Sequence, residues 1–206
     1  QTSIRPYTLA YSENLKGGTV MFGNTSMHIV DNGNVNLTKM NQTGNANNGV
    51  GGLGFSQYGN DNSNMTFIDV DGTTGDGAAT KNSSSADLVL PAGTNTIRFA
   101  RLYWGGRIAN STVNATPDTL RKIKIRKGTS GAYTSAITAA SNVASFNIAN
   151  TTDKVYQSFV DITQFVNTLG SGTYTVADIP STAGSIGSGG AYAGWTIVVA
   201  YENTAV

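Results

Sequence analysis

The sequence has no cysteine and only one histidine, His28, among its 206 residues. The lack of cysteine excludes a zinc–thiolate site, an iron–sulfur cluster, a cysteine nucleophile and a disulfide framework. With a single histidine, any catalytic serine would have only this residue as a histidine base. His28 lies in a strand-like run, and we interpret it as a structural residue.

Charge is also scarce. Charged residues make up 12% of the chain, about half the usual share. The 13 basic and 12 acidic side chains leave a formal net charge of +1. Because this balance creates no field that attracts polyanions, we expect neither nucleic acid nor anionic lipid as a partner. No apolar run approaches the length that spans a bilayer, so we do not expect direct membrane insertion.

Helical periodicity is missing from nearly all of the chain, and strand-like segments separated by Gly, Asn and Ser turns take its place. The clearest segments are residues 19–22, 26–30, 65–70, 86–90, 96–104, 120–127, 143–148, 155–162, 173–179 and 194–201. This pattern predicts an all-β fold, a jelly-roll-type β-sandwich with long loops rich in Asn and Gly. We expect one domain over residues 1–206, or a domain that is incomplete at its C-terminus. Only residues 163–168 could form a helical turn, capped by Asp161 or Thr163.

Alternation of side chains assigns faces to two of these segments. In residues 120–127, Ile123 and Ile125 point one way, while Lys122, Lys124 and Arg126 point the other. This pattern predicts a half-buried strand with a solvated basic face. Such a face could bind a polyanion, but lysines that guard a sheet edge give the same pattern and fit the balanced charge better.

Residues 195–201 are apolar on both faces, which is typical of a strand in the centre of a sheet. Only five residues follow Tyr201, too few for another strand of usual length. Unless earlier strands pair with both of its edges, we predict that another chain, or residues beyond Val206, meets this strand by strand addition. The residues expected in the core are Leu102, Trp104, Ile123, Ile125, Phe159, Ile162, Val176, Ile197 and Val199.

A turn rich in Asp and Gly gives the best candidate for a metal site. Asp69, Asp71 and Asp76 could gather around one Ca²⁺, which prefers several oxygens from a tight turn. The turn is not an EF-hand, because Gly72 comes too early and Thr80 stands where the bidentate Glu would be. The alternative is an ordinary turn held by bonds from side chains to the backbone, which we favour because Asp-Gly turns are common.

Nothing in the sequence indicates catalysis. Ser83, Ser84 and Ser85 form a run without the Gly-x-Ser-x-Gly elbow of a nucleophile, and they are expected at the edge of a strand. Glu13 and Glu202 are the only glutamates, and no acid pair lies in a recognisable setting. We therefore predict a protein that is not an enzyme, with no cleft in which two titratable groups have opposed pKa shifts.

Exposed aromatic residues are the candidates for ligand contact. Residues 41–64 form a long segment rich in Asn and Gly, which is either a connector or a binding loop, and Tyr58 lies in it. Tyr103 and Tyr192 lie in or beside strand-like segments. If these tyrosines contact a ligand, a carbohydrate-binding module becomes one of the functions to consider.

Six segments are informative when they are read together, and in order they are residues 67–72, 82–88, 100–106, 159–166, 172–179 and 193–202. Together they resemble the N-terminal domain of large, repeat-containing surface proteins of bacteria. Many proteins of this kind look like cell-surface adhesins of the Bacteroidetes that the type 9 secretion system exports, some of them linked to gliding motility. Residues 161–176 also resemble part of the galactose-binding-like jelly roll, which supports the fold but implies no sugar site.

The resemblance implies an extracellular location, at the bacterial cell surface, and a non-catalytic adhesin-like or structural module. The alternatives are a calcium-assisted carbohydrate-binding module and a filament subunit completed by neighbouring chains. The expected partner is a surface glycan or protein, or further domains or chains of the same assembly.

Overall fold

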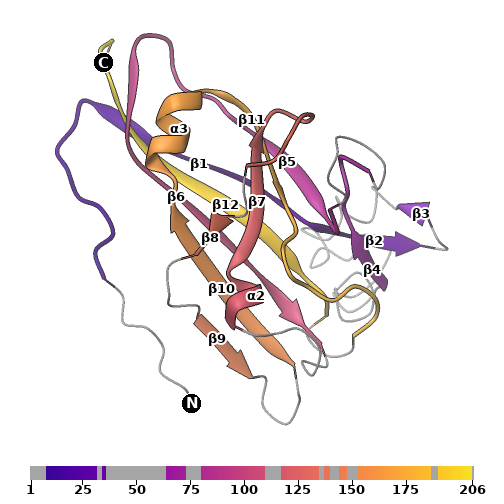
Figure 1. Cartoon of the computed structure of the whole chain (residues 1–206). Helices are drawn as coiled ribbons and strands as arrows, with labels where there is room; N and C mark the ends of the chain where they lie inside the picture. The colour runs from indigo at the N-terminus through magenta and orange to yellow at the C-terminus, as the bar shows by residue number, and fades with distance from the viewer. Residues whose placement is uncertain are drawn as a thin grey trace, which may run out of the picture.

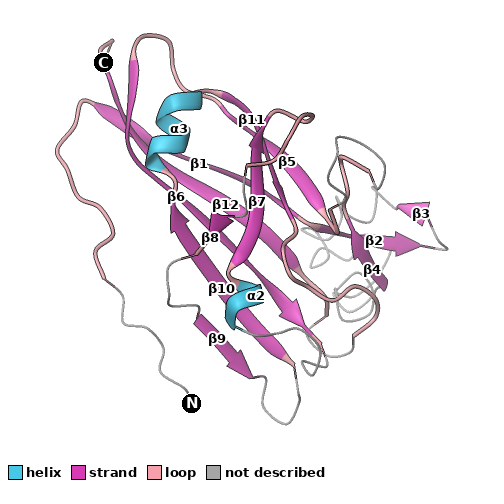
Figure 2. Ribbon diagram, viewed as in Figure 1, coloured by secondary structure: helices cyan, strands magenta, loops and turns pink. Residues whose placement is uncertain are grey.

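A computed structural model describes residues 8–31, 34–35, 64–72, 80–109, 117–134, 137–139, 144–147, 153–186 and 190–205. These residues form an all-β sandwich, which confirms the predicted fold class (Figures 1 and 2). The Asn- and Gly-rich residues 41–63 lie outside the described part of the chain. The elements are β1 (Gly17–Thr25), β2 (Met27–Asp31), β3 (Asn34–Val35), β4 (Asn64–Phe67), β5 (Ser83–Leu88), β6 (Asn95–Ile108), α2 (Pro117–Leu120), β7 (Lys122–Lys127), β8 (Ile137–Thr138), β9 (Ala144–Asn147), β10 (Lys154–Asp161), α3 (Thr163–Leu169), β11 (Gly172–Ala177) and β12 (Ala193–Asn203).

Two antiparallel sheets make the sandwich. The first has the order β1-β12-β6-β10-β9, and the second has the order β5-β11-β7-β8. A small third sheet, β3-β2-β4, extends to one side in Figure 1. In the part of the chain that is described, no helix is long and apolar enough to cross a membrane.

The core lies between the two large sheets, and aromatic side chains join them. The indole Nε1 of Trp195 on β12 donates to Ser84 Oγ on β5 at 2.8 Å. The ring of Phe22 on β1 lies 5.6 Å from that of Tyr174 on β11. Because the indole N–H of Trp195 finds a partner, this ring can be buried without leaving a donor unsatisfied.

The predicted core is confirmed except at one residue. The buried members are Leu102, Trp104, Ile123, Ile125, Ile162, Val176, Ile197 and Val199. Phe159, also expected in the core, is half-buried and lies on the outer face of the first sheet. It pairs across strands with Tyr103, and its neighbour Ser158 is the residue that faces inward. The inward positions of β10 are therefore Tyr156 and Ser158, and the expected burial of Phe159 is wrong.

Strand β12 is central, as predicted, but both of its neighbours come from this chain. The N-terminal strand β1 pairs with one edge along all of its nine residues, and β6 pairs with the other. The condition under which we predicted strand addition at β12, an edge that this chain leaves open, is therefore not met. The physical reason is that β1 and β12 lie side by side although they are distant in the sequence, so backbone hydrogen bonds within the chain satisfy this strand.

The helical turn expected at residues 163–168 is the helix α3, which covers one end of the sandwich (Figure 1). Its N-cap residue is Ile162, and no side chain caps it. The Asp161 carboxylate instead accepts the backbone N–H of Thr163 at 2.9 Å. Val166 is fully buried, so one face of the helix is anchored in the core.

Candidate functional site

The outer face of the first sheet carries the main candidate site. Along β12, Trp195 and Ile197 are buried in the core, so the intervening Thr196 and the following Val198 face outward. Tyr103 on β6 is the cross-strand partner of Thr196 and lies on the same face. This face therefore carries a half-buried aromatic ring, a hydroxyl group and an aliphatic side chain.

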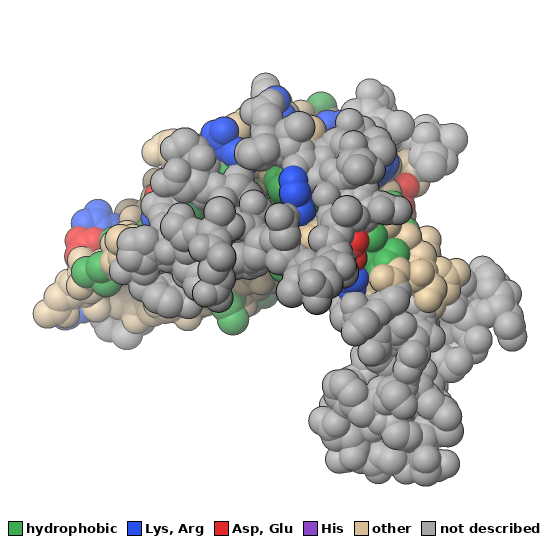
Figure 3. All heavy atoms as spheres, turned by 90° about the horizontal axis from the view of Figure 1, so that it is seen from below, with side chains coloured by type: hydrophobic (Ala, Val, Ile, Leu, Met, Phe, Trp, Pro, Cys, Tyr) green, Lys and Arg blue, Asp and Glu red, His purple; other side chains and the backbone are tan. Residues whose placement is uncertain are grey.

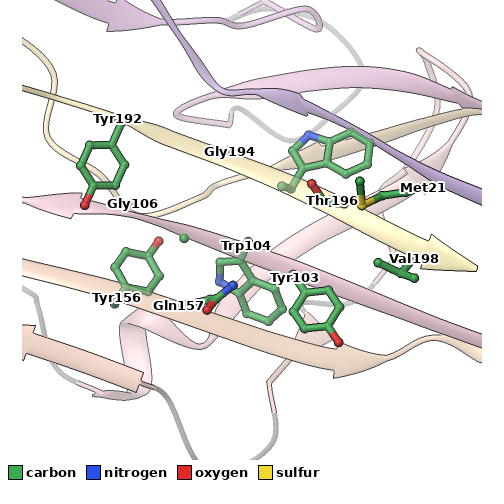
Figure 4. A pocket seen from close by; sticks show the side chains of 12 residues that line it. Met21, Tyr103, Trp104, Gly106, Tyr156, Gln157, Tyr192, Gly194, Thr196 and Val198 are labelled. Carbon is green, nitrogen blue, oxygen red and sulfur yellow. The ribbon is translucent and has the colours of Figure 1, made fainter. Parts of the chain in front are cut away.

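A groove with a volume of about 390 Å³ lies on this face, and we call it the tyrosine groove (Figure 4). Gly194 and Gly105 are cross-strand partners at its floor. A Cβ atom at Gly105 would lie 2.6 Å from the Tyr156 carbonyl oxygen, so the close approach of β10 requires glycine here. The lining residues are Met21, Tyr103, Trp104, Gly105, Gly106, Tyr156, Gln157, Tyr192, Gly194, Trp195, Thr196 and Val198.

Two of the three predicted ligand-contact aromatics line the tyrosine groove. Figure 4 shows Tyr192 toward one end of the groove and Tyr103 toward the other. Tyr192 is 36% exposed, and Tyr103 is half-buried against Phe159, with ring centroids 5.8 Å apart. The third aromatic, Tyr58, lies outside the described residues. The sheet thus brings together two residues that are 89 positions apart in the sequence (192 minus 103).

Sequence reasoning missed the rest of the groove. Gln157 and Thr196 supply an amide and a hydroxyl beside the tyrosines, and Met21 lies at the rim with 70% of its surface exposed. The one available signal was glycine inside strand-like runs, at Gly105 and Gly194, because such glycines often mark a close approach of another chain or a ligand.

The predicted calcium turn has a different set of contacts. The Asp71 carboxylate accepts hydrogen bonds from Thr80 Oγ1 at 2.9 Å and from Ser83 Oγ at 2.8 Å. It also accepts the hydroxyl of Tyr133, and the Nη2 atom of Arg126 lies 3.8 Å away. The side chains of Asp71 and Arg126 are each 1% exposed. We call these five residues, together with Asp69, whose carboxylate also accepts from Ser83 Oγ at 2.9 Å, the Asp71 cluster.

The Asp71 cluster includes two neighbouring carboxyl groups with opposed pKa shifts. Burial and a hydrogen bond with Asp71 raise the pKa of Asp69. Burial also opposes the ionisation of Asp71, but hydrogen bonds from Asp69, Tyr133 and Ser83 outweigh it and hold the pKa of Asp71 at about 2. Burial, reinforced by the Asp71 carboxylate, raises the pKa of Tyr133. The ionised form of Asp71 is therefore stabilised by donors of the protein itself.

An opposed pair of this kind was not expected from the sequence, yet it is not presented to a substrate. The Asp71 side chain is almost fully enclosed, and proton donors of the chain occupy its oxygens. Ser83 Oγ donates to both carboxylates and accepts the backbone N–H groups of Val70 at 2.9 Å and Asp71 at 3.2 Å. With its lone pairs used, Ser83 acts as a connector rather than as a nucleophile.

Of the predicted calcium ligands, Asp69 and Asp71 come together around Ser83 Oγ, and Asp76 lies outside the described residues. Within the ranges that the structure describes, no group of three or more His, Cys, Asp or Glu side chains could hold a metal ion. The calcium site stays a prediction.

The basic strand face predicted for β7 is only partly solvated. Ile123 and Ile125 are buried, as expected, and Lys122 is exposed. Lys124 forms an ion pair with Asp178 at 2.9 Å, but Arg126 is buried in the Asp71 cluster, so the expected solvated position is wrong there. On the side of the molecule drawn in Figure 3, the described Lys and Arg side chains form separate small groups rather than one patch.

Comparison with known proteins identifies no relative of this chain. No family model, no curated protein and no solved structure matches the chain. The resemblance to bacterial surface proteins therefore stays a prediction, and the argument for function rests on the geometry of the chain itself.

Proposed function

We propose that this chain is a non-catalytic, adhesin-like binding module of an extracellular or cell-surface bacterial protein, and that the tyrosine groove binds a glycan. The observation that carries the proposal is the meeting of Tyr103, Tyr192, Gln157 and Thr196 along one groove of a sheet face. Tyr103, Gln157 and Thr196 lie on regular strands and Tyr192 directly precedes β12, which matters because side chains on a sheet are held more firmly than those on a loop.

The chemistry of the groove fits a sugar chain. Tyrosine offers an apolar ring and a polar hydroxyl, so it can cover the C–H face of a sugar and still reach water. Gln157 and Thr196 can donate and accept hydrogen bonds, as the hydroxyl groups of a sugar require. The volume of about 390 Å³ is at the lower end of the range for small-ligand sites. It would hold a short stretch of a longer chain.

The composition of the lining favours binding over catalysis. Among the described residues that line the groove, none is Asp, Glu, His, Lys or Arg. Hydrolysis of a glycosidic bond usually needs two carboxyl groups on either side of it. The described carboxyl pair with opposed pKa shifts, Asp69 and Asp71, belongs to the enclosed Asp71 cluster instead.

The test is a glycan array followed by calorimetric titration of the best oligosaccharide. We expect Tyr103→Ala and Tyr192→Ala each to weaken binding at least tenfold, because each removes a ring that covers the ligand. Tyr11→Ala is the matched control, since Tyr11 stacks on Phe99 at 5.1 Å and does not line the groove. The proposal fails if no glycan binds, or if the control weakens binding as much as the groove variants do.

A further inference from the structure

An arginine lies beside the tyrosine groove on the same sheet face. Arg101 on β6 is two residues from Tyr103, so both side chains point outward from the strand. Its cross-strand partner on β12 is Val198, which lines the groove. The buried neighbours Ala100 and Leu102 confirm that the side chain of Arg101 points away from the core.

Two aromatic rings flank the Arg101 guanidinium. Its Cζ atom lies 4.8 Å from the ring centroid of Phe159 and 5.2 Å from that of Phe99. Such rings attract a cation through their negative faces, so they hold the charge in one place without neutralising it. The half-exposed position of Phe159, unexpected from the sequence, is explained by this contact.

The side chain of Arg101 has no hydrogen bond or ion pair with any of the described residues. Its Nε atom is buried and has no hydrogen-bond partner. The side chain as a whole is only half-buried, so an acceptor can approach the part of it that water reaches. By contrast, Arg98 on the same strand is paired with Glu13 at 2.8 Å.

The carboxylate of Asp161 belongs to a neighbouring residue on β10, but it accepts a hydrogen bond from the backbone of Thr163. Asp161 is the cross-strand partner of Arg101 on β10, and its Oδ1 atom accepts the backbone N–H of Thr163. Since β10 and β12 flank β6 on opposite sides, Asp161 and Val198 lie on opposite sides of Arg101. Val198 and Tyr103, which neighbour Arg101 and line the groove, carry no charge, so an anion in the groove would meet no carboxylate beside Arg101 at these positions.

We infer that the tyrosine groove takes an acidic glycan and that Arg101 pairs with a carboxylate of one of its sugars. This inference rests on the proposed function. Guanidinium binds carboxylate through two parallel N–H···O bonds, and it is the side chain best suited to such planar recognition. The tyrosines then recognise the ring of the sugar, while Arg101 recognises its charge. A neutral glycan would leave the guanidinium unpaired.

The experiment compares acidic oligosaccharides with their carboxyl-reduced, neutral counterparts, using oligomers of alginate, polygalacturonate and hyaluronan. Calorimetric titration gives the affinity of the wild type, Arg101→Gln, Arg101→Lys and the control Arg98→Gln. We expect at least one acid to bind about tenfold more tightly than its neutral counterpart, the usual effect of one charge-assisted hydrogen bond. Arg101→Gln should abolish that preference, Arg101→Lys should keep part of it, and Arg98→Gln should leave it unchanged. Circular dichroism and thermal melting show that each variant is folded.

The outcomes separate this inference from the proposed function. Equal binding of acid and neutral forms, or an acid preference that survives Arg101→Gln, overturns the role of Arg101 and leaves a glycan-binding groove. Binding of neutral glycans alone has the same consequence. If no glycan binds and the tyrosine variants change nothing, both proposals fail.

Discussion

Among the described residues, Arg101 and Arg126 both have aromatic neighbours but differ in the rest of their surroundings. Arg126, in the Asp71 cluster, lies with its Cζ atom 4.4 Å from the ring centroid of Tyr133, donates to the carbonyls of Thr129 and Gly131, and is 1% exposed. Arg101, beside the tyrosine groove, also has two rings next to its guanidinium. It is half-exposed, however, and its side chain has no hydrogen bond with the described residues. An aromatic neighbour alone therefore does not define the role of an arginine.

The partners of each arginine indicate that role. In the Asp71 cluster the protein supplies both the acceptors and the countercharge, so the charges act to hold segments of the chain together. At the groove the protein holds the charge of Arg101 in place but supplies no acceptor among the described residues, so the exposed N–H groups of its side chain are available to a ligand. Stability should therefore depend on the first region and binding on the second.

The largest effect is expected from breaking the Asp71 cluster. Asp71→Ala leaves the buried Arg126 without its countercharge and removes the acceptor of three hydroxyl groups. We expect a loss of about 3–5 kcal/mol in the free energy of unfolding, as is usual when one partner of a buried pair is removed. Arg101→Gln should cost about 1 kcal/mol or less, because it removes only contacts with rings on an outer face. Urea unfolding at neutral pH measures both values.

Lys124→Ala is the control for that comparison. Lys124 also forms an ion pair, with Asp178 at 2.9 Å, but the two side chains are 29% and 30% exposed. We expect a cost below about 1 kcal/mol, which is typical of ion pairs that water reaches. If Asp71→Ala costs no more than Lys124→Ala, the cluster does not hold the fold and the comparison between the two arginines is wrong.

The next effect concerns acid. The folded protein lowers the pKa of Asp71 from its usual value of 3.8 to about 2, so its stabilising contribution is present above pH 4 and is lost as the pH falls toward 2. The shift corresponds to about 2 kcal/mol. We expect the free energy of unfolding of the wild type to fall by about that amount between pH 4.5 and pH 2. In Asp71→Asn this decrease should be smaller by the same amount.

Asp69 should behave in the opposite way. Because its pKa is raised in the folded protein, its ionisation opposes folding, and its contribution to stability is lost as the pH rises through the folded-state pKa. Asp69→Asn keeps an acceptor for Ser83 Oγ but removes the negative charge beside Asp71. The free energy of unfolding of this variant minus that of the wild type should therefore be larger at pH 7 than at pH 3. A constant difference across that range would show that the folded protein does not raise the pKa of Asp69.

Much of the fold could be predicted because its signals are local. The alternation at Ile123 and Ile125 gave the right strand and the right buried face, and the doubly apolar run of β12 gave a central strand, although its outer face at Thr196 and Val198 is only half-buried. The strands that were missed, β3 and β8, have two residues each and are too short to show a period. The pairing of β12 with β1 escaped prediction because nothing local in either strand specifies a partner that is so distant in the sequence.

The site was less predictable because its contacts are long-range. Arg126 looked solvated from alternation alone, and it is buried because Asp71, 55 positions earlier in the sequence (126 minus 71), supplies a countercharge. Phe159 looked like a core residue and instead packs on Tyr103 and Arg101 across neighbouring strands. Tyr103 and Tyr192 were identified as candidates, but their shared groove depends on the register of β6 and β12.

The smallest effect is expected from calcium, and it tests whether the Asp71 cluster is complete without a metal. Ca²⁺ needs several free oxygens, yet the Asp71 oxygens already accept hydroxyl protons, and Arg126 holds a positive charge 3.8 Å from one of them. We therefore expect millimolar calcium and its chelation to leave the thermal midpoint unchanged. A bound ion would instead raise the stability by about 2.7 kcal/mol at a hundredfold excess over the dissociation constant. A rise of that kind, abolished by Asp76→Asn but retained in Asp87→Asn on β5, would show that the turn at residues 69–76 binds calcium and that the enclosed contacts of Asp71 rearrange to admit it.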